Sequence, residues 1–190
     1  MKLLILLFLV VGCATKPLPV VNNESVKPGS SVNFMGNKVK LYKGSLKVGD
    51  KFSHKTNRTG INFKFQNKVT IVNIVPSIDT PVCEAQTHIL GEDKTINKGI
   101  DLVTISRDLP MAQSRFAKEA KLTNINYYSD YKYGKFGKKT GLLLKDKELL
   151  ARGVLVLDEK GIVRYIQIVS EITQIPDMNK AIQFANSLVK

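Results

Sequence analysis

The chain has 190 residues, 43% of them hydrophobic, which is enough for one globular domain with its own core and excludes a disordered chain. Its 29 lysine and arginine residues outnumber its 16 aspartate and glutamate residues, so the formal net charge is +13. The basic residues are scattered singly, without an arginine-rich tract or interleaved aromatic residues, and we therefore expect no nucleic-acid partner.

The first residues are typical of a targeting segment. Lys2 precedes an unbroken apolar run at 3–11, which is about half of the ~20 residues that a membrane-spanning helix needs. The run leads into Val-Val-Gly-Cys, a tetrapeptide that resembles a bacterial lipobox, whose cysteine is acylated and becomes the new N-terminus. We predict a lipoprotein signal peptide at 1–12 and a lipid anchor on Cys13, with plain secretory cleavage as the alternative.

The segment that follows is predicted to be a tether. Residues 13–30 are rich in proline, asparagine, serine and glycine, which are typical of turns and linkers. A tether of this kind would hold a folded domain, at residues 31–190, off a membrane surface. We therefore expect a lipid-anchored protein of the bacterial cell envelope, on the periplasmic side of the inner or the outer membrane, with the membrane as a partner.

Residues 31–190 are predicted to form one α/β domain with a mixed sheet flanked by helices. A strand–helix–strand–helix order in the middle of the chain predicts parallel strands, and Asp-Glu-Lys-Gly between two later strands predicts an antiparallel hairpin. This order resembles a thioredoxin-like fold with an N-terminal β-hairpin. The predicted strands are 32–35, 39–42, 61–65, 69–75, 102–106, 154–157 and 162–166, and the predicted helices are 82–90, 111–122 and 178–188.

Cys83 is the candidate nucleophile. We predict Thr80 as the N-cap of a helix and Pro81 as its first residue, because the N–H that proline lacks would be unpaired there. Cys83 then lies in the first turn, near free backbone N–H groups and the positive end of the helix dipole, which favour the reactive thiolate. Thr80 lies on the same helical face, so we expect its hydroxyl to approach the sulfur. The alternative is that Cys83 is an inert buried side chain.

The sequence around Cys83 is Val-Pro-Ser-Ile-Asp-Thr-Pro-Val-Cys-Glu-Ala-Gln-Thr, at residues 75–87. It resembles the active-site loop of bacterial atypical thiol peroxidases, a subfamily of the peroxiredoxins. Further segments of this chain agree with that subfamily in the same order, from about residue 32 to the end. They are 32–37, 46–50, 104–113, 149–158, 169–173 and 176–177.

The resemblance implies a role for each matching residue. Cys83 matches the peroxidatic cysteine, which attacks the O–O bond of a peroxide and becomes a sulfenic acid. Thr80 matches the threonine that bonds thiolate and peroxide, and Pro76 matches the proline that shields the thiolate. Arg152 matches the arginine beside the sulfur, which would stabilise the thiolate and orient the peroxide. Hydrogen peroxide or an organic hydroperoxide is then the substrate, and a homodimer is the expected assembly.

The chain departs from the subfamily at the resolving cysteine. Members commonly have Arg-Phe-Cys on the helix after the second strand, whereas this chain has Arg-Phe-Ala ending at Ala117. Cys13 is the one other cysteine, and acylation of its sulfur would remove it. We therefore expect a one-cysteine mechanism in which an external thiol, thioredoxin-like or of low molecular weight, reduces Cys83. Gln86, on the next turn of the helix, is expected either to support this site or to cap the pocket rim.

Other functions are alternatives to this one. Thiol–disulfide exchange requires a second cysteine, and Thr80-Pro-Val-Cys83 stands where a Cys-x-x-Cys motif would be. A membrane-anchored peroxide sensor, or a thioredoxin-like lipoprotein without turnover, stays open as an alternative. His54 and His88 lack metal-ligand spacing with Cys83, so we expect no metal and no other cofactor.

Overall fold

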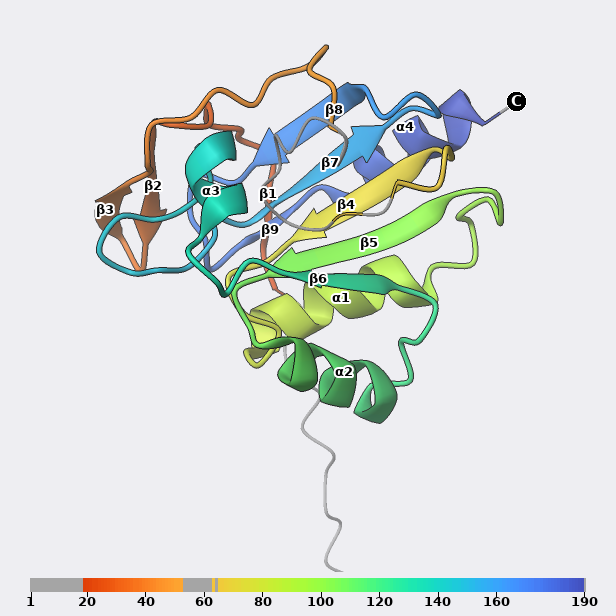
Figure 1. Ribbon diagram of the computed structural model, residues 1–190, viewed down its shortest axis with the longest axis horizontal. Coiled ribbons are helices and arrows are strands. Elements are labelled where there is room, and N and C mark those ends of the chain that lie inside the picture. Colours follow the sequence, from red (N-terminus) through yellow and green to blue (C-terminus); the bar gives the residue numbers. More distant parts are fainter. Residues whose placement is uncertain (1–18, 53–62, 64, 190) are drawn as a thin grey trace, which may run out of the picture.

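The computed structural model describes residues 19–52, 63 and 65–189 (Figure 1). Within these residues the central sheet has the strand order β6-β5-β4-β7-β8. β5 pairs in parallel with β4 and with β6, whereas β7 pairs antiparallel with β4 and with β8, so the predicted mixed sheet is confirmed. These strands are β4 (Thr70–Ile74), β5 (Asp101–Ser106), β6 (Asn126–Ser129), β7 (Gly153–Leu157) and β8 (Val163–Ile168).

Two apolar clusters cover the two faces of this sheet. Every residue of β4 and of β7 is buried, as expected for central strands that are covered on both sides. Because successive side chains of a strand point to opposite faces, Ile71 packs with one cluster and Val72 with the other. The β-branched run that predicted β4 therefore forms the middle of the core.

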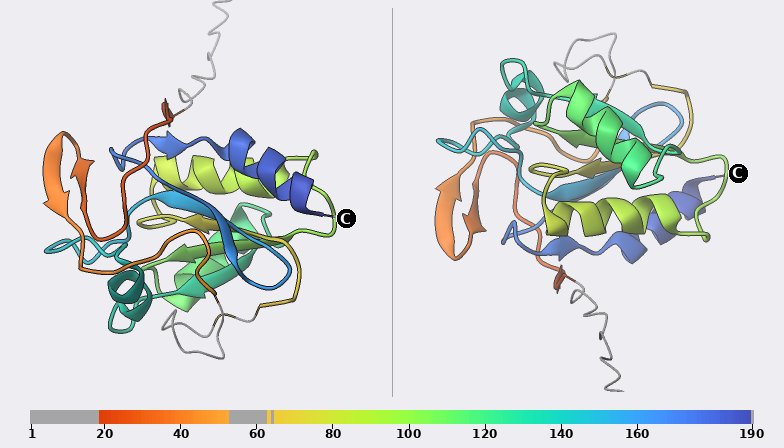
Figure 2. Two further views of the ribbon diagram at one scale, coloured as in Figure 1. Left: turned by 90° about the horizontal axis from the view of Figure 1, so that it is seen from above. Right: turned by 90° about the horizontal axis from the view of Figure 1, so that it is seen from below.

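The helices divide between these clusters. α1 (Pro81–Glu92) and α4 (Met178–Leu188) lie side by side on one face of the sheet (Figure 2). α2 (Pro110–Glu119) lies along β6, and Phe116 packs against the same cluster as α1 and α4. α3 (Lys135–Thr140) packs Phe136 into the cluster on the other face. No helix among the described residues is both long enough and apolar enough to cross a membrane.

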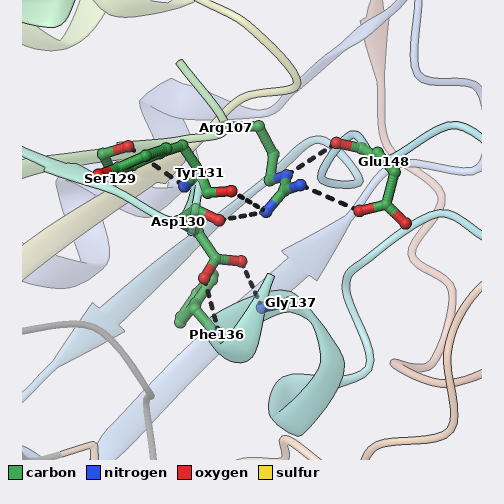
Figure 3. Close-up of polar contacts among 7 residues, drawn as sticks. All are labelled: Arg107, Ser129, Asp130, Tyr131, Phe136, Gly137 and Glu148. Atoms are coloured by element: carbon green, nitrogen blue, oxygen red, sulfur yellow. Dashed lines mark hydrogen bonds and ion pairs between the residues drawn. The ribbon is translucent and has the colours of Figure 1, made fainter. Parts of the chain in front are cut away.

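The lysine-rich segment 132–139 has no apolar periodicity that predicts a helix, yet its second half lies in α3. Residues of α3 are held by Asp130, whose carboxylate accepts the backbone N–H groups of Phe136 and Gly137 at 2.9 Å each. Arg107 donates to the carbonyl of Asp130 and pairs with Glu148 at 3.0 Å, and both contacts can be followed in Figure 3. Burial raises the pKa of Asp130, and the two backbone donors oppose that rise.

The predicted N-terminal hairpin is present, with a different turn. β2 (Ser31–Phe34) and β3 (Asn37–Lys40) pair antiparallel around Met35 and Gly36, which both have positive φ, at 53° and 78°. Two central residues with φ above zero are the requirement of the tightest hairpin turns. The carboxylate of Glu171 accepts the N–H groups of Met35 and Gly36 at 3.2 and 3.0 Å and so attaches the turn to the domain.

The predicted tether was wrong for residues 21–30, which belong to the folded domain. β1 (Val21–Asn22) pairs in parallel with β9 (Ile175–Pro176). Asn22 is 9% exposed, and its amide donates to Ser170 Oγ at 2.9 Å and to Gln174 Oε1 at 2.8 Å. The polar residues that suggested a linker therefore serve as hydrogen-bonding partners. Cys13 and His54, like most of the predicted strand 61–65, lie outside the described residues.

Deleting residues 1–30 is expected to destabilise the domain, whereas deleting residues 1–18 is not. The longer deletion removes β1 and the hydrogen bond from Val26 N–H to Ile168 O at 2.9 Å. At about 1 kcal/mol per net hydrogen bond, the loss should be roughly 2–5 kcal/mol in the free energy of unfolding. Urea titrations of the two truncated proteins measure it. Equal midpoints would show that residues 19–30 contribute nothing to folding.

Candidate active site

Cys83 lies in the first turn of α1, as predicted. Thr80 is the N-cap in an extended conformation, with φ −137° and ψ 144°, and Pro81 is the first helical residue. Cys83 is therefore the third helical residue, where backbone N–H groups have no partner within the helix. Its side chain is 0% exposed and packs with Val75 and Ile78. The sulfur is thus shielded from solvent at the positive end of the helix.

Arg152 lies directly against this sulfur. Its Nη2 donates to Cys83 Sγ at 3.2 Å, and the arginine side chain is only 3% exposed. The two residues are 69 positions apart, and the antiparallel pairing of β4 with β7 places Gly153 opposite Ile74, just before the active-site loop. Burial lowers the pKa of Arg152, while the charge of a Cys83 thiolate and its hydrogen bond with the guanidinium act in the opposite direction.

Two further acceptors fix the orientation of Arg152. Its Nε donates to the carbonyl of Ile172 at 2.7 Å, and its Nη1 donates to Gln86 Oε1 at 2.9 Å. Gln86 is fully buried, and its amide nitrogen donates to Asn73 Oδ1 at 2.6 Å. Gln86 is therefore a support for the arginine and not a cap on the pocket rim. With its donors directed to three fixed acceptors, the guanidinium is pre-organised for a negative charge on the sulfur.

Asn73, the residue at the base of this network, was not predicted from the sequence. Its amide nitrogen donates to Thr87 Oγ1 and to Thr104 Oγ1, at 3.1 Å each. Thr87 in turn donates to the backbone carbonyl of Cys83 at 2.7 Å. An asparagine in the middle of an otherwise apolar central strand was the available signal, because a buried amide requires polar partners.

Thr80 and Pro76 lie in the loop before α1. Pro76 is buried, whereas Thr80 is exposed. The hydroxyl of Thr80 donates to the carbonyl of Ser77 at 3.2 Å and not to the sulfur of Cys83. Its engagement with Ser77 instead closes a short turn that leads into the helix.

Asp108, which was not predicted either, fixes the same loop from just after the end of β5. Its carboxylate accepts Ser77 Oγ at 2.6 Å and the backbone N–H of Ile78 at 2.8 Å. The hydroxyl of Ser129 donates to the backbone carbonyl of Asp108. The loop that carries Pro76 and Thr80 is thereby attached to two neighbouring strands of the sheet.

Replacing Asp108 with alanine is expected to slow the reaction of Cys83 with peroxide by roughly 10- to 100-fold, the range expected when a reacting group is displaced by about 1 Å. Asp108→Asn retains an acceptor for the Ile78 N–H, so its reaction with peroxide should be slowed less. Stopped-flow measurement of a single turnover gives both rates, and thermal unfolding shows whether each variant is folded. A folded Asp108→Ala protein that reacts at the wild-type rate would show that Asp108 does not position the loop.

A cavity of about 300 Å³ lies between the first turn of α1 and α2. Ile78 and Phe116 line it and also pack in the cluster that contains Cys83. Ala117, the next residue of α2, is 8% exposed and supplies no thiol. Among the described residues Cys83 is the free cysteine.

Comparisons with known proteins show the family to which the chain belongs. The family model described as Redoxin matches residues 48–182. The chain is 39% identical over 166 residues to the thiol peroxidase of Bacillus subtilis, covering 85% of this chain and 99% of that protein. The crystal structure of a peroxiredoxin-like protein from Aquifex aeolicus matches with a TM-score of 0.73 and 32% identity, over 84% of this chain and 97% of that one.

A thiol peroxidase from Chromobacterium violaceum has the same fold, with a TM-score of 0.67 at 15% identity, over 84% of this chain and 99% of that one. The family match spans most of the domain, and it includes the helix of Cys83 and the strand that follows Arg152. The chain therefore belongs to the thiol peroxidases, peroxiredoxin-type oxidoreductases with a thioredoxin-like fold.

Proposed function

We propose that the thiol-dependent peroxidase activity of this family resides here on Cys83 alone, by a one-cysteine mechanism. The observation that carries the proposal is the 3.2 Å contact between Arg152 Nη2 and Cys83 Sγ in a buried site at a helix N-terminus. A guanidinium in that position stabilises the thiolate before attack and the negative charge that passes to the peroxide oxygens during it.

The first half-reaction oxidises the cysteine. The thiolate of Cys83 attacks one oxygen of the peroxide, an S–O bond forms and the O–O bond breaks. The leaving oxygen takes up a proton and departs as water or an alcohol, and Cys83 is left as a sulfenic acid. Hydrogen peroxide and small organic hydroperoxides are the proposed substrates.

The second half-reaction requires thiols from outside the chain. One thiol condenses with the sulfenic acid to give a mixed disulfide and water, and a second thiol releases Cys83 as a thiol together with an external disulfide. Ala117 on α2 supports this route, because its methyl group cannot form a disulfide with Cys83. The proposed reductant is a thioredoxin-like protein or a thiol of low molecular weight.

We also propose that acylation of Cys13 anchors the protein in the bacterial cell envelope, and that the domain is a homodimer. The lipobox-like tetrapeptide supports the anchor. Mass spectrometry of the membrane-extracted protein tests the anchor, and sedimentation of the domain tests the dimer. An unmodified Cys13 or a monomeric domain would refute the respective proposal.

The activity is tested with the domain from residue 19, assayed for peroxide consumption with thioredoxin, glutathione and a small dithiol. Continuous turnover with at least one of them is expected, and Cys83→Ser should show none. A single burst with every reductant would instead favour the peroxide sensor, in which oxidation of Cys83 is the signal. Absence of even a burst would contradict the proposal.

A further inference from the structure

The described chain begins at the active-site end of the domain. Ile175 N–H donates to Val20 O at 2.9 Å in the parallel pairing of β1 with β9, which brings Pro19 towards Thr173. Pro19 and Thr173 both line a groove of about 600 Å³ along α1, together with Pro81 and His88. Thr173 follows Ile172, whose carbonyl holds Arg152. In both views of Figure 2 the first described residues lie on the side of α1 and α4, and α3 lies on the opposite side.

The connection from this point to the proposed anchor is short. Five residues, 14–18, separate Cys13 from Pro19, and an extended chain of that length spans at most about 20 Å. A compact domain of this size is roughly 40 Å across. A tether running to residue 30 would have reached about 60 Å and let the domain turn freely. Because residues 21–30 are bound to the domain, the remaining connection is too short to let the domain turn freely.

We propose that the bilayer carrying the anchor is the partner of the α1 side of the domain, so that the active-site end faces the membrane. The proposal rests on the acylation of Cys13 proposed above. Val20 and Val21, directly after the connection, are 64% and 49% exposed and present unpartnered apolar side chains at this corner. Peroxide and thiol then reach Cys83 from the zone between the domain and the lipid headgroups.

The charges on the two sides of the domain favour the opposite orientation. The short connection and charge attraction therefore predict different results. The groove along α1 is lined by carboxylates, including Glu84 and Glu92. On the α3 side, lysines surround exposed aromatic rings, as with Lys132 and Lys135 about 5.5 Å from the ring of Tyr133. Attraction to an anionic leaflet alone would therefore turn the α3 side to the membrane. The short connection predicts the α1 side instead, at low and high salt alike.

The chain has no tryptophan, so a single introduced tryptophan reports on one face. The acylated protein, which begins at Cys13, is reconstituted in vesicles that contain spin-labelled lipid as a fluorescence quencher. His88→Trp reports on the groove side, and Tyr133→Trp, at a side chain that is 64% exposed, is the matched control on the α3 side. Vesicles of phosphatidylcholine and of phosphatidylglycerol separate the effect of the connection from that of charge.

We expect quenching in His88→Trp and none in Tyr133→Trp, with both kinds of vesicle. Inserting a 20-residue glycine–serine linker after Lys16 should abolish this difference on phosphatidylcholine and reverse it on phosphatidylglycerol, where charge alone then sets the orientation. Equal quenching of the two reporters without the linker, or stronger quenching of Tyr133→Trp, would overturn the orientation while leaving the anchor intact. A protein whose mass shows no acyl chain on Cys13 would overturn the anchor and the orientation together, without touching the peroxidase chemistry.

Discussion

Replacing Arg152 with glutamine should slow the reaction of Cys83 with peroxide by roughly 10²–10³-fold, the range found when one pre-organised donor is removed from a site of developing charge. Glutamine is neutral and too short to reproduce the Nη2 contact with the sulfur at 3.2 Å. Pre-steady-state rates at several peroxide concentrations measure the effect.

The matched variant is Arg152→Lys. It keeps the positive charge and loses the planar fork that reaches the sulfur, Gln86 and Ile172 together, so its rate should lie between those of the wild type and Arg152→Gln. Both variants leave buried acceptors without a donor, at a cost of about 1–3 kcal/mol for each group. Rates are therefore compared below the unfolding transition of each variant. A folded Arg152→Gln protein with the wild-type rate would contradict the electrostatic role.

Replacing Cys83 with serine should abolish peroxide reduction altogether. A serine hydroxyl is not ionised under conditions in which a thiolate forms, and oxygen does not undergo the sulfur oxidation that the cycle requires. Cys83→Ser changes one buried atom beside Arg152, so the fold should survive, as circular dichroism would show.

Cys13→Ser is the control for this variant, since Cys13 is the other cysteine of the chain. The full-length Cys13→Ser protein should retain the rate of the first half-reaction. Loss of peroxide reduction in Cys13→Ser, or its persistence in Cys83→Ser, would show that Cys83 is not the reacting cysteine.

Much of the sheet was predictable because its strands are locally distinct. The run that became β4 is almost entirely β-branched, and β7 and β8 flank a turn with strong composition signals. α1 was predicted to begin at Pro81, and the structure begins it there, with Thr80 as an N-cap residue whose side chain makes no capping hydrogen bond. These elements are specified by short-range preferences that agree with their environment.

The missed elements depend on distant partners. β6 is a short strand at the edge of the sheet, and β1 has only two residues. α3 contains Gly137 and several lysines, and its start is fixed by Asp130 from outside the helix. Local sequence carries no record of such contacts, so β6 and α3 were not predicted and β1 was predicted to be part of a tether.

The same distinction applies to the active site. The position of Cys83 in the first turn followed from Thr80 and Pro81, which are its neighbours in sequence. Its contact with Arg152 depends on strand pairing across 69 residues, and only the family resemblance suggested it. Asp108 reaches the loop of Ser77 across 31 residues and was not predicted at all.

The central claim is that Cys83 alone carries the oxidised state between the two half-reactions. The most direct test is the intact mass of the domain from residue 19, after one equivalent of peroxide and a sulfenate-trapping reagent, without any thiol. We predict one trapped adduct per chain, located on Cys83 by peptide mapping and missing from Cys83→Ser. An untrapped protein of unchanged mass, or a disulfide-linked dimer in place of the adduct, would contradict it.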